Sequence, residues 1–207
     1  DLIEKYPNMY GAIGIHPEDV DDATQEDIKF IEDNLSNEKI VAIGEIGLDY
    51  YYTKDNKEEQ IKLFETQLAL AEKYNLPVIV HSRDATEDTI NSLKKFNCKG
   101  VIHSFSGSLE TARIYIKMGY LLGVNGVITF KNAKIKEVIK EVGLENILLE
   151  TDSPYLTPEP FRGKQNNPGH VFEIAKFVAD LYNISLEELA KKTNKNIAIM
   201  YKKMKLD

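Results

Sequence analysis

The sequence has a single cysteine, Cys98, among its 207 residues, and it contains no long apolar run. One cysteine can form neither a disulfide within the chain nor a zinc–thiolate cluster, so we expect a protein of the reducing cytoplasm. No stretch approaches the roughly 18 apolar residues that span a bilayer, and the first residues do not join a basic to an apolar region. The sequence therefore predicts a protein that is neither membrane-embedded nor secreted.

Basic residues are outnumbered by acidic ones. There are 26 Lys and Arg residues against 33 Asp and Glu residues, which gives a formal net charge of −7. This balance argues against a protein that coats duplex DNA, because such binding needs many cationic contacts to phosphate. Hydrophobic residues make up 43% of the chain, as in ordinary globular proteins. No repeat, low-complexity tract or linker is visible, and we expect residues 1–207 to form one domain.

Apolar runs rich in Val and Ile alternate with amphipathic segments along the chain. The runs predict strands at 9–16, 40–46, 77–82, 100–105, 120–125 and 147–152. Successive apolar residues of this kind are typical of parallel strands buried on both faces, and spacings of three and four predict helices between them. The alternation predicts an α/β protein, either a doubly wound open sheet or a (β/α)8 barrel.

Polar side chains stand at the ends of these six predicted strands. They are His16, Glu45, His81, His103, Asn125 and Asp152. In a barrel, the carboxyl ends of the strands converge on one mouth, where such enzymes carry their active sites. The segment GAIGIHP after the first strand lacks both the dinucleotide and the P-loop glycine spacing, which favours the barrel over the open sheet.

Burial of the Glu45 carboxylate in a two-sided strand indicates a metal ligand. It would cost several kcal/mol unless the group is paired or ligated, and no Lys or Arg lies beside it in sequence. Imidazole and carboxylate ligands suit a divalent ion such as Zn²⁺ or Mn²⁺ in a catalytic centre. Taken singly, each of these residues can also be a hydrogen-bonded core residue or a helix cap. Glu150 shares a strand face with Asp152, and either acid can be the inner group.

Two further features have simpler interpretations. His170 follows a Pro-Gly turn with no strand before it, and we expect a structural or exposed residue. The three tyrosines at 50–52 can either stack on a base or shield the rim of the barrel.

Seven segments in order carry a family resemblance. They are GIHPEDV at 14–20, VAIGEIGLDYYY at 41–52, PVIVHSRDA at 77–85, GVIHSFSG at 100–107, LLGVNGVITFKNA at 121–133, LLETDSPYLTPEPFRGKQNNP at 148–168 and TNKNIAIMY at 193–201. Over essentially the whole chain they resemble the TatD family of metal-dependent deoxyribonucleases, which are amidohydrolase-like TIM barrels.

The resemblance implies a role for each residue at the strand ends. Glu45 would bridge or bind the metals, His81 and His103 would ligate one ion, and Asp152 would bind the other and act as general base. The residues implied in substrate binding are His16, Arg83, Asn125, Arg162 and Lys164. The implied cofactors are two divalent ions (Mg²⁺, Mn²⁺ or Zn²⁺), and the implied substrate is DNA, trimmed from its 3′ end with single strands favoured.

The sequence departs from the family at its start. The family opens with a strand carrying a His-x-His ligand pair, and DLIEKYPNMY contains none. The 207 residues and six predicted strands also fall short of the roughly 250 residues of a complete barrel. We therefore expect an N-terminally truncated (β/α)8 barrel that lacks its first two βα units. Glu45, His81 and His103 would still make a site for one ion, whereas the second ion would keep only Glu45 and Asp152. The uncovered sheet edges of the truncated barrel would favour self-association.

Two other functions remain open from the sequence. The same barrel architecture can hydrolyse an uncharged cyclic amide, lactone or phosphotriester, and Arg83, Arg162 and Lys164 turned away from Glu45 would favour that reading. Alternatively, the chain is a catalytically dead truncated barrel that binds a metal or a partner without turnover.

Overall fold

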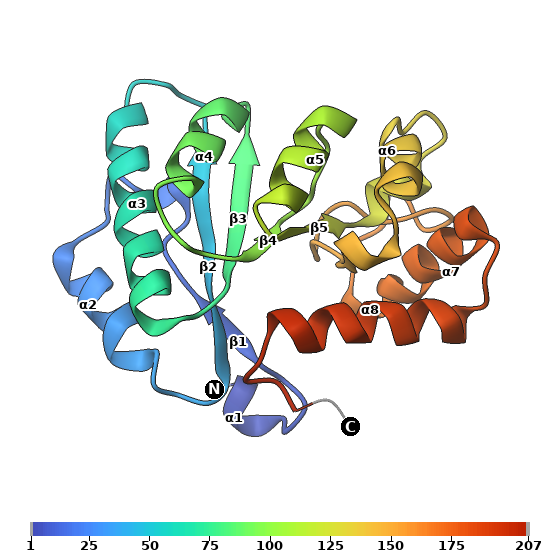
Figure 1. The fold of residues 1–207 in the computed structure, drawn as a ribbon, viewed down its shortest axis with the longest axis horizontal. Helices are drawn as coiled ribbons and strands as arrows, with labels where there is room; N and C mark the ends of the chain where they lie inside the picture. Colours follow the sequence, from blue (N-terminus) through green and yellow to red (C-terminus); the bar gives the residue numbers. More distant parts are fainter. Residues whose placement is uncertain (1, 206–207) are drawn as a thin grey trace. The chain divides into compact units, whose positions relative to one another are not determined.

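The computed structural model describes residues 2–205, and the chain divides into two compact units. Unit 1 comprises Asp1–Val101 with Met200–Asp207, and unit 2 comprises Ile102–Ile199. Each unit is described by itself below, with the element labels of Figure 1.

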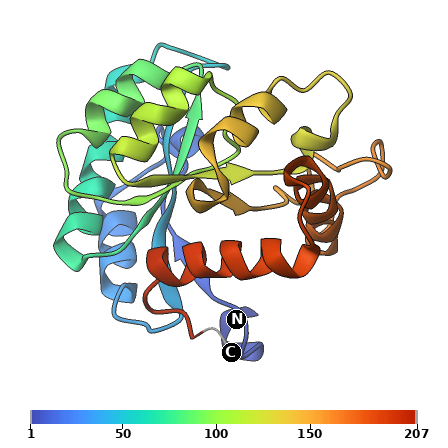
Figure 2. The same cartoon turned by 45° about the vertical axis from the view of Figure 1, so that its right-hand side comes forward.

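Helices alternate with strands in unit 1. Its elements are α1 (Leu2–Lys5), β1 (Gly11–Ile13), the 3-10 helix η1 (Pro17–Asp19), α2 (Gln25–Asn34), β2 (Ile40–Asp49), α3 (Lys57–Tyr74), β3 (Val78–Arg83) and α4 (Thr86–Leu93). The strands are parallel, with Ile13 opposite Ile43 and Asp49 opposite Arg83. The long helix α3 packs against β2 (Figures 1 and 2), which helps to bury β2 over most of its length.

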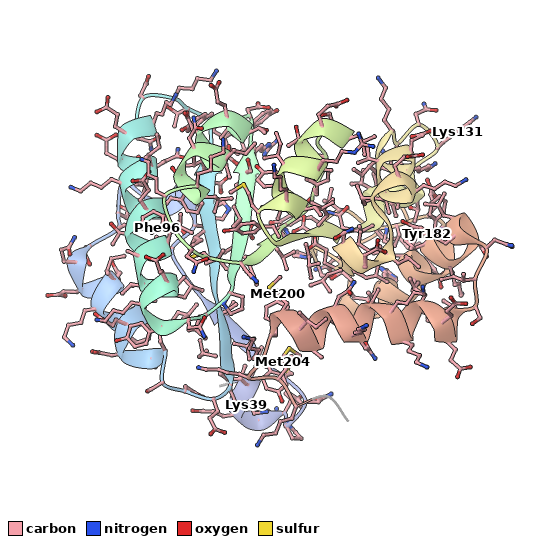
Figure 3. The ribbon with its side chains drawn as sticks, in the orientation of Figure 1. Lys39, Phe96, Lys131, Tyr182, Met200 and Met204 are labelled. Atoms are coloured by element: carbon pink, nitrogen blue, oxygen red, sulfur yellow. The ribbon has the colours of Figure 1, made fainter. Side chains whose placement is uncertain are left out.

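Unit 2 follows the same alternation and then becomes helical. After β4 (Gly100–Ile102), in which the boundary between the units falls, come α5 (Leu109–Lys117), β5 (Tyr120–Val124), η2 (Gly126–Thr129), α6 (Ile135–Val142), η3 (Leu144–Asn146), β6 (Ile147–Leu149), η4 (Pro168–His170), α7 (Val171–Tyr182) and α8 (Leu186–Met200). Strands β5 and β6 are parallel, with Val124 opposite Leu149. Tyr182, labelled in Figure 3, donates a hydrogen bond from α7 to the Ile139 carbonyl of α6.

The six predicted strands and the α/β class are confirmed, although the strand ends differ. Within unit 1, β2 pairs with both β1 and β3, and within unit 2, β5 pairs with β6. Strands β1, β4 and β6 are only three residues long and stop before the polar residues that were predicted to end them. Strand β2 instead continues three residues beyond the predicted end, to Asp49. The predicted polar residues therefore stand on the connections that follow the short strands. Glu45 and His81 are exceptions, because they lie within β2 and β3.

Local capping explains where several helices begin. Thr24 and Asp27 form a reciprocal capping box at the start of α2. The Ser185 hydroxyl accepts a hydrogen bond from the Glu188 backbone N–H at 3.1 Å at the start of α8. None of the helices within residues 2–205 combines the length and apolar character needed to cross a membrane.

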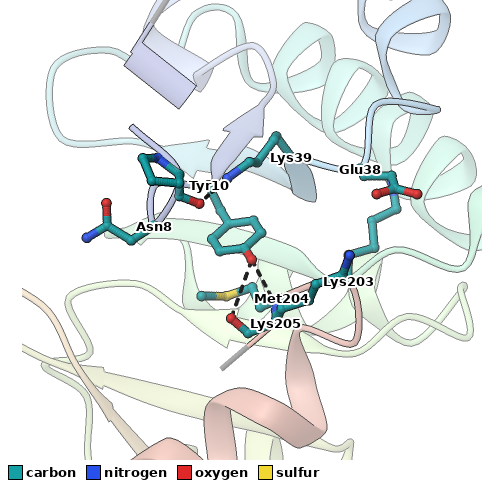
Figure 4. Close-up of a pocket in the computed structure, with 8 residues that line it drawn as sticks. Asn8, Tyr10, Glu38, Lys39, Lys203, Met204 and Lys205 are labelled. Carbon is teal, nitrogen blue, oxygen red and sulfur yellow. Dashed lines mark hydrogen bonds between the residues drawn. The ribbon is translucent and has the colours of Figure 1, made fainter. Parts of the chain in front are cut away.

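A cavity of about 540 Å³ lies in unit 1 beside the start of β2 (Figure 4). The Lys39 ammonium, just before β2, donates to the Pro7 and Met9 carbonyls. Across the cavity, the Lys205 backbone N–H donates to the Tyr10 hydroxyl at 3.0 Å. Because Lys39 precedes β2, the cavity lies at the amino end of this strand, whereas the candidate ligands stand towards its carboxyl end.

Candidate metal centre

Three side chains of unit 1 form a cluster that can hold a cation. His16, Glu45 and His81 each offer a ligand atom, and these atoms lie within 4.8 Å of one another. The His81 Nδ1 atom is 3.0 Å from Glu45 Oε1, and the ring centroids of His16 and His81 are 4.5 Å apart. Two imidazoles and one carboxylate within this span fit a divalent ion, whose ligand bonds are about 2.0–2.2 Å long.

Three consecutive strands of unit 1 position the cluster. His16 follows β1 and caps η1, where its Nδ1 accepts from the Glu18 backbone N–H at 3.3 Å. This bond leaves the Nε2 of His16 as the nitrogen available to an ion. Glu45 lies where the pairing of β2 with β3 shifts between Ile43 and Ile46, and His81 lies in β3 opposite Gly47. The parallel arrangement therefore brings the three residues to one region of unit 1.

Asp49 is a functional candidate that our reading of the sequence missed. Its Oδ2 is 2.8 Å from the His81 Nε2, its Oδ1 accepts from the Tyr51 backbone N–H, and only 3% of the residue is exposed. A carboxylate on the far nitrogen of a ligand imidazole fixes the ring and its tautomer. The sequence does contain a signal for Asp49, because the apolar run IVAIGEIGLD ends in this acidic residue. The signal was missed because the predicted strand ended at residue 46.

The two imidazoles have opposite pKa shifts. Burial lowers the pKa of His81, but its hydrogen bonds to Glu45 and Asp49 and their charges outweigh burial, so the pKa lies above its usual value. Burial and the neighbouring charge of His81 lower the pKa of His16. The two carboxylates thus stabilise a positive charge at the His81 ring. A divalent cation bound beside its Nδ1 would supply positive charge at the same place.

Unit 2 contains a second histidine between two carboxylates. The His103 Nδ1 is 3.0 Å from Glu150 Oε2, and its Nε2 is 2.9 Å from Asp152 Oδ1. Glu150 also accepts from the Ser104 backbone N–H at 2.6 Å. Both acids left open by the sequence therefore reach this ring, with Glu150 anchored to the backbone. Asn125 is buried, and its amide donates to the Ser104 hydroxyl at 2.6 Å.

The structure thus brings together two pairs of the predicted ligands. Glu45 and His81 are joined in unit 1, and His103 and Asp152 in unit 2. That these four residues act as ligands of one or two adjacent ions stays a prediction. His16, which the resemblance placed beside the site, lies within the ligand cluster of unit 1.

Each basic residue predicted to bind phosphate lies over an aromatic ring on an exposed segment. The Arg83 guanidinium is 3.6 Å from the ring centre of Tyr51. In unit 2, Arg162 is 4.1 Å from the ring centre of Phe130, and the Lys164 ammonium is 5.7 Å from that of Phe161.

The three consecutive tyrosines divide by burial. Tyr50 is buried and its hydroxyl donates to Asp88 at 3.1 Å, whereas Tyr51 and Tyr52 are 56% and 70% exposed. Tyr52 and Asp49 line a cavity of about 320 Å³. Only Tyr51 and Tyr52 therefore present rings on which a base could stack.

His170 has the structural environment that we expected. Its ring stacks on Phe161 with centroids 4.8 Å apart, and its Nδ1 is 2.8 Å from the Asn166 amide oxygen. Asn166 in turn donates to the Thr151 carbonyl at 2.7 Å, so these contacts organise the segment after β6.

Comparison with known proteins gives concordant matches. The family described as TatD related DNase matches residues 1–202. The chain is 46% identical to YabD of Bacillus subtilis (strain 168), named an uncharacterized metal-dependent hydrolase, over 98% of this chain and 81% of that protein. The crystal structure of YjjV, a TatD homologue from Escherichia coli K12, matches with a TM-score of 0.89 and 33% identity, covering 97% of this chain and 80% of that one.

A second solved structure extends the likeness to a eukaryote. A TatD family hydrolase from Entamoeba histolytica matches with a TM-score of 0.84 and 28% identity, covering 98% of this chain and 79% of that one. The predicted α/β fold of the TIM-barrel type is thereby confirmed, as is the predicted metal-dependent hydrolase. The chain belongs to the TatD family of metal-dependent hydrolases.

Proposed function

We propose that this protein hydrolyses phosphodiester bonds in DNA, with single strands favoured and cleavage proceeding from the 3′ end. The observation that carries the proposal is the cluster of His16, Glu45 and His81, whose ligand atoms lie within 4.8 Å of one another. The matching family is described as TatD related DNase, which supports DNA as the substrate. When bound, a divalent cation supplies Lewis-acid activation of water and of the phosphoryl group.

The chain's own residues then have distinct tasks. Glu45 and His81 hold the cation from neighbouring strands, and Asp49 keeps the His81 ring turned towards Glu45. In unit 2, His103 orients Asp152, which keeps a partly exposed carboxylate. We assign Asp152 as the general base that accepts the proton of the attacking water. We also assign His103 and Asp152 as metal ligands, as the family resemblance implies.

Substrate contacts are assigned to positively charged side chains and to exposed aromatic rings. Arg83 offers a planar guanidinium to a phosphate, and it lies 3.6 Å from the Tyr51 ring centre, at the end of the strand that carries His81. Tyr52 exposes 70% of its surface, and such a ring can stack on an unpaired base. Arg162 and Lys164, both exposed, are assigned to further phosphates. Exposed tyrosines near a cationic side chain favour a single-stranded substrate over a duplex.

Metal analysis combined with a nuclease assay tests the proposal. The purified chain is loaded with Mn²⁺ or Zn²⁺ and given single-stranded DNA labelled at its 5′ end, so that shortening from the 3′ end appears as a ladder. We expect Glu45→Ala to lose bound metal and to lower the cleavage rate by about a hundredfold or more. Glu58→Ala changes an exposed carboxylate of α3 and should retain both properties.

The same assay separates the other functions. Bound metal with equal, background cleavage by the unaltered protein and Glu45→Ala would contradict the nuclease proposal and favour a dead barrel. Turnover of a lactone or phosphotriester, without DNA cleavage, would favour a hydrolase of uncharged substrates.

A further inference from the structure

Helix α3 carries two glutamines on its buried face. Gln60 is 2% exposed and Gln67 is 0% exposed, and they share this face with Phe64 and Leu68. A seven-residue separation is close to two helical turns, so the two side chains project from the same side about 10 Å apart. A buried primary amide is unfavourable unless it is hydrogen-bonded, which makes its partners informative.

Gln67 binds both backbone groups of the residue before His16. The Ile15 N–H donates to the Gln67 Oε1 at 2.7 Å, and the Gln67 Nε2 donates to the Ile15 carbonyl at 3.0 Å. Strand β1 has ended at Ile13, so Ile15 lies beyond it. The glutamine amide therefore takes the place of a neighbouring strand and holds the backbone that carries His16.

Gln60 makes the same pair of bonds to Asp49. The Asp49 N–H donates to the Gln60 Oε1 at 2.8 Å, and the Gln60 Nε2 donates to the Asp49 carbonyl at 2.9 Å. The pairing of β2 with β1 has ended at Ile43, well before this point. Asp49 in turn contacts the far nitrogen of the His81 ring at 2.8 Å. Fixing the Asp49 backbone therefore fixes the carboxylate behind His81.

Each pair of glutamine hydrogen bonds thus holds a residue that lies next to a candidate ligand. We propose that Gln60 and Gln67 are positioning residues of the metal centre, through which α3 sets the placement of the His81 and His16 imidazoles. The inference rests on the proposed metal centre of unit 1. Apolar side chains at these two positions could also fill the buried face, but, unlike a carboxamide, they cannot pair with the N–H and the carbonyl of one residue. Ligand groups must be held to within about 0.5 Å for a working site, which such directional bonds provide.

Cobalt binding tests the inference without relying on activity. The full chain and the variants Gln60→Met and Gln67→Met are titrated with Co²⁺, recording the visible absorption bands and the dissociation constant in competition with a chromophoric chelator. We expect each variant to bind Co²⁺ about 10- to 100-fold more weakly, with shifted bands, because the ligand geometry changes. The control Leu68→Met alters an apolar side chain of the same buried face and should leave affinity and spectrum unchanged.

A graded pair of variants covers the case in which a methionine variant does not fold. Gln60→Asn and Gln67→Asn keep the carboxamide on a side chain one methylene shorter, so the bonds to the backbone weaken without adding a charge, and we expect an intermediate loss of Co²⁺ affinity. In the unaltered protein, the Ile15 and Asp49 amide protons should exchange slowly with solvent, because they donate to the buried glutamine side chains and not to a neighbouring strand. Fast exchange of both amides would overturn the inference.

The outcomes separate this inference from the proposed function. Wild-type Co²⁺ affinity and spectrum in folded glutamine variants would overturn the inference alone. Failure of the unaltered protein to bind Co²⁺ would overturn the metal centre and the inference together. Weakened Co²⁺ binding in the variants of a protein that does not cleave DNA would support the inference and contradict only the nuclease proposal.

Discussion

Asp49 uses both of its carboxylate oxygens within unit 1. One contacts the His81 ring at 2.8 Å and the other accepts from the Tyr51 backbone N–H at 2.9 Å. Glu150 of unit 2 is similar, since it joins the His103 ring and the Ser104 backbone N–H. In each unit, one acid ties an imidazole to the main chain while a more exposed acid, Glu45 or Asp152, meets its other nitrogen. Each histidine ring is thus oriented by the more buried acid. The two histidine side chains stay partly exposed, 20% for His81 and 16% for His103.

The close approach of Gly47 to β3 leads to a testable prediction at the same scale. Its φ is +148°, and a Cβ there would lie 2.0 Å from the His81 carbonyl oxygen in β3. Backbone strain and the clash together predict that Gly47→Ala lowers the free energy of unfolding by about 3 kcal/mol or more, measured by urea denaturation.

Gly163 provides the matched control for this prediction. Its φ is also positive, at +87°, but nothing lies within 4 Å of the position of a Cβ. Gly163→Ala should therefore cost only about 1 kcal/mol, from the backbone conformation alone. Equal losses in the two alanine variants would contradict the close approach of β2 to β3 as the cause.

At the scale of elements, side-chain amides connect helices to the backbone of other elements. Gln60 and Gln67 of α3 do so in unit 1. In unit 2, Asn196 of α8 donates to the Leu144 carbonyl at 2.7 Å and to the Ile147 carbonyl at 2.9 Å. The helix is thereby held both to η3 and to the first residue of β6.

Removal of the Asn196 amide tests this connection. Asn196 is 7% exposed, so Asn196→Ala leaves two carbonyls without their donor in a buried place. We expect the free energy of unfolding to fall by about 1–3 kcal/mol. Asn194 is an exposed asparagine of the same helix, and Asn194→Ala should change stability by less than about 0.5 kcal/mol. Because alanine has the higher helix propensity, a comparable loss in both variants would contradict the two buried bonds as the cause.

At the scale of the whole molecule, a cation at His16, Glu45 and His81 would connect three strands of unit 1. A ligand that binds only the folded state stabilises it by about 2.7 kcal/mol at a hundredfold excess over its dissociation constant. We therefore expect Zn²⁺ or Mn²⁺ to raise the melting temperature and a chelator to lower it, as followed by circular dichroism. The same additions should not shift the melting temperature of Glu45→Ala. An equal shift in that variant would place the stabilising cation elsewhere.

Local patterns in the sequence were sufficient to predict the order of strands and helices and the α/β class. Unbroken apolar runs mark strands buried on both faces, and spacings of three and four mark helices, so both signals are contained in short windows. The same runs predicted polar residues at the strand ends, and the structure places several of them on the connections just after the short strands. The ordered motifs then indicated the TatD family, which the relatives confirm.

Only the tertiary structure decided which of these polar residues meet. His81 is 36 positions from Glu45 in sequence, and Gln67 is 52 positions from Ile15, so no local pattern reports either contact. The shift in pairing between Ile43 and Ile46 also overrides a simple alternation of faces along β2. Asp49 and the glutamines of α3 were missed for this reason: their partners depend on strand register and helix placement, which long-range packing determines.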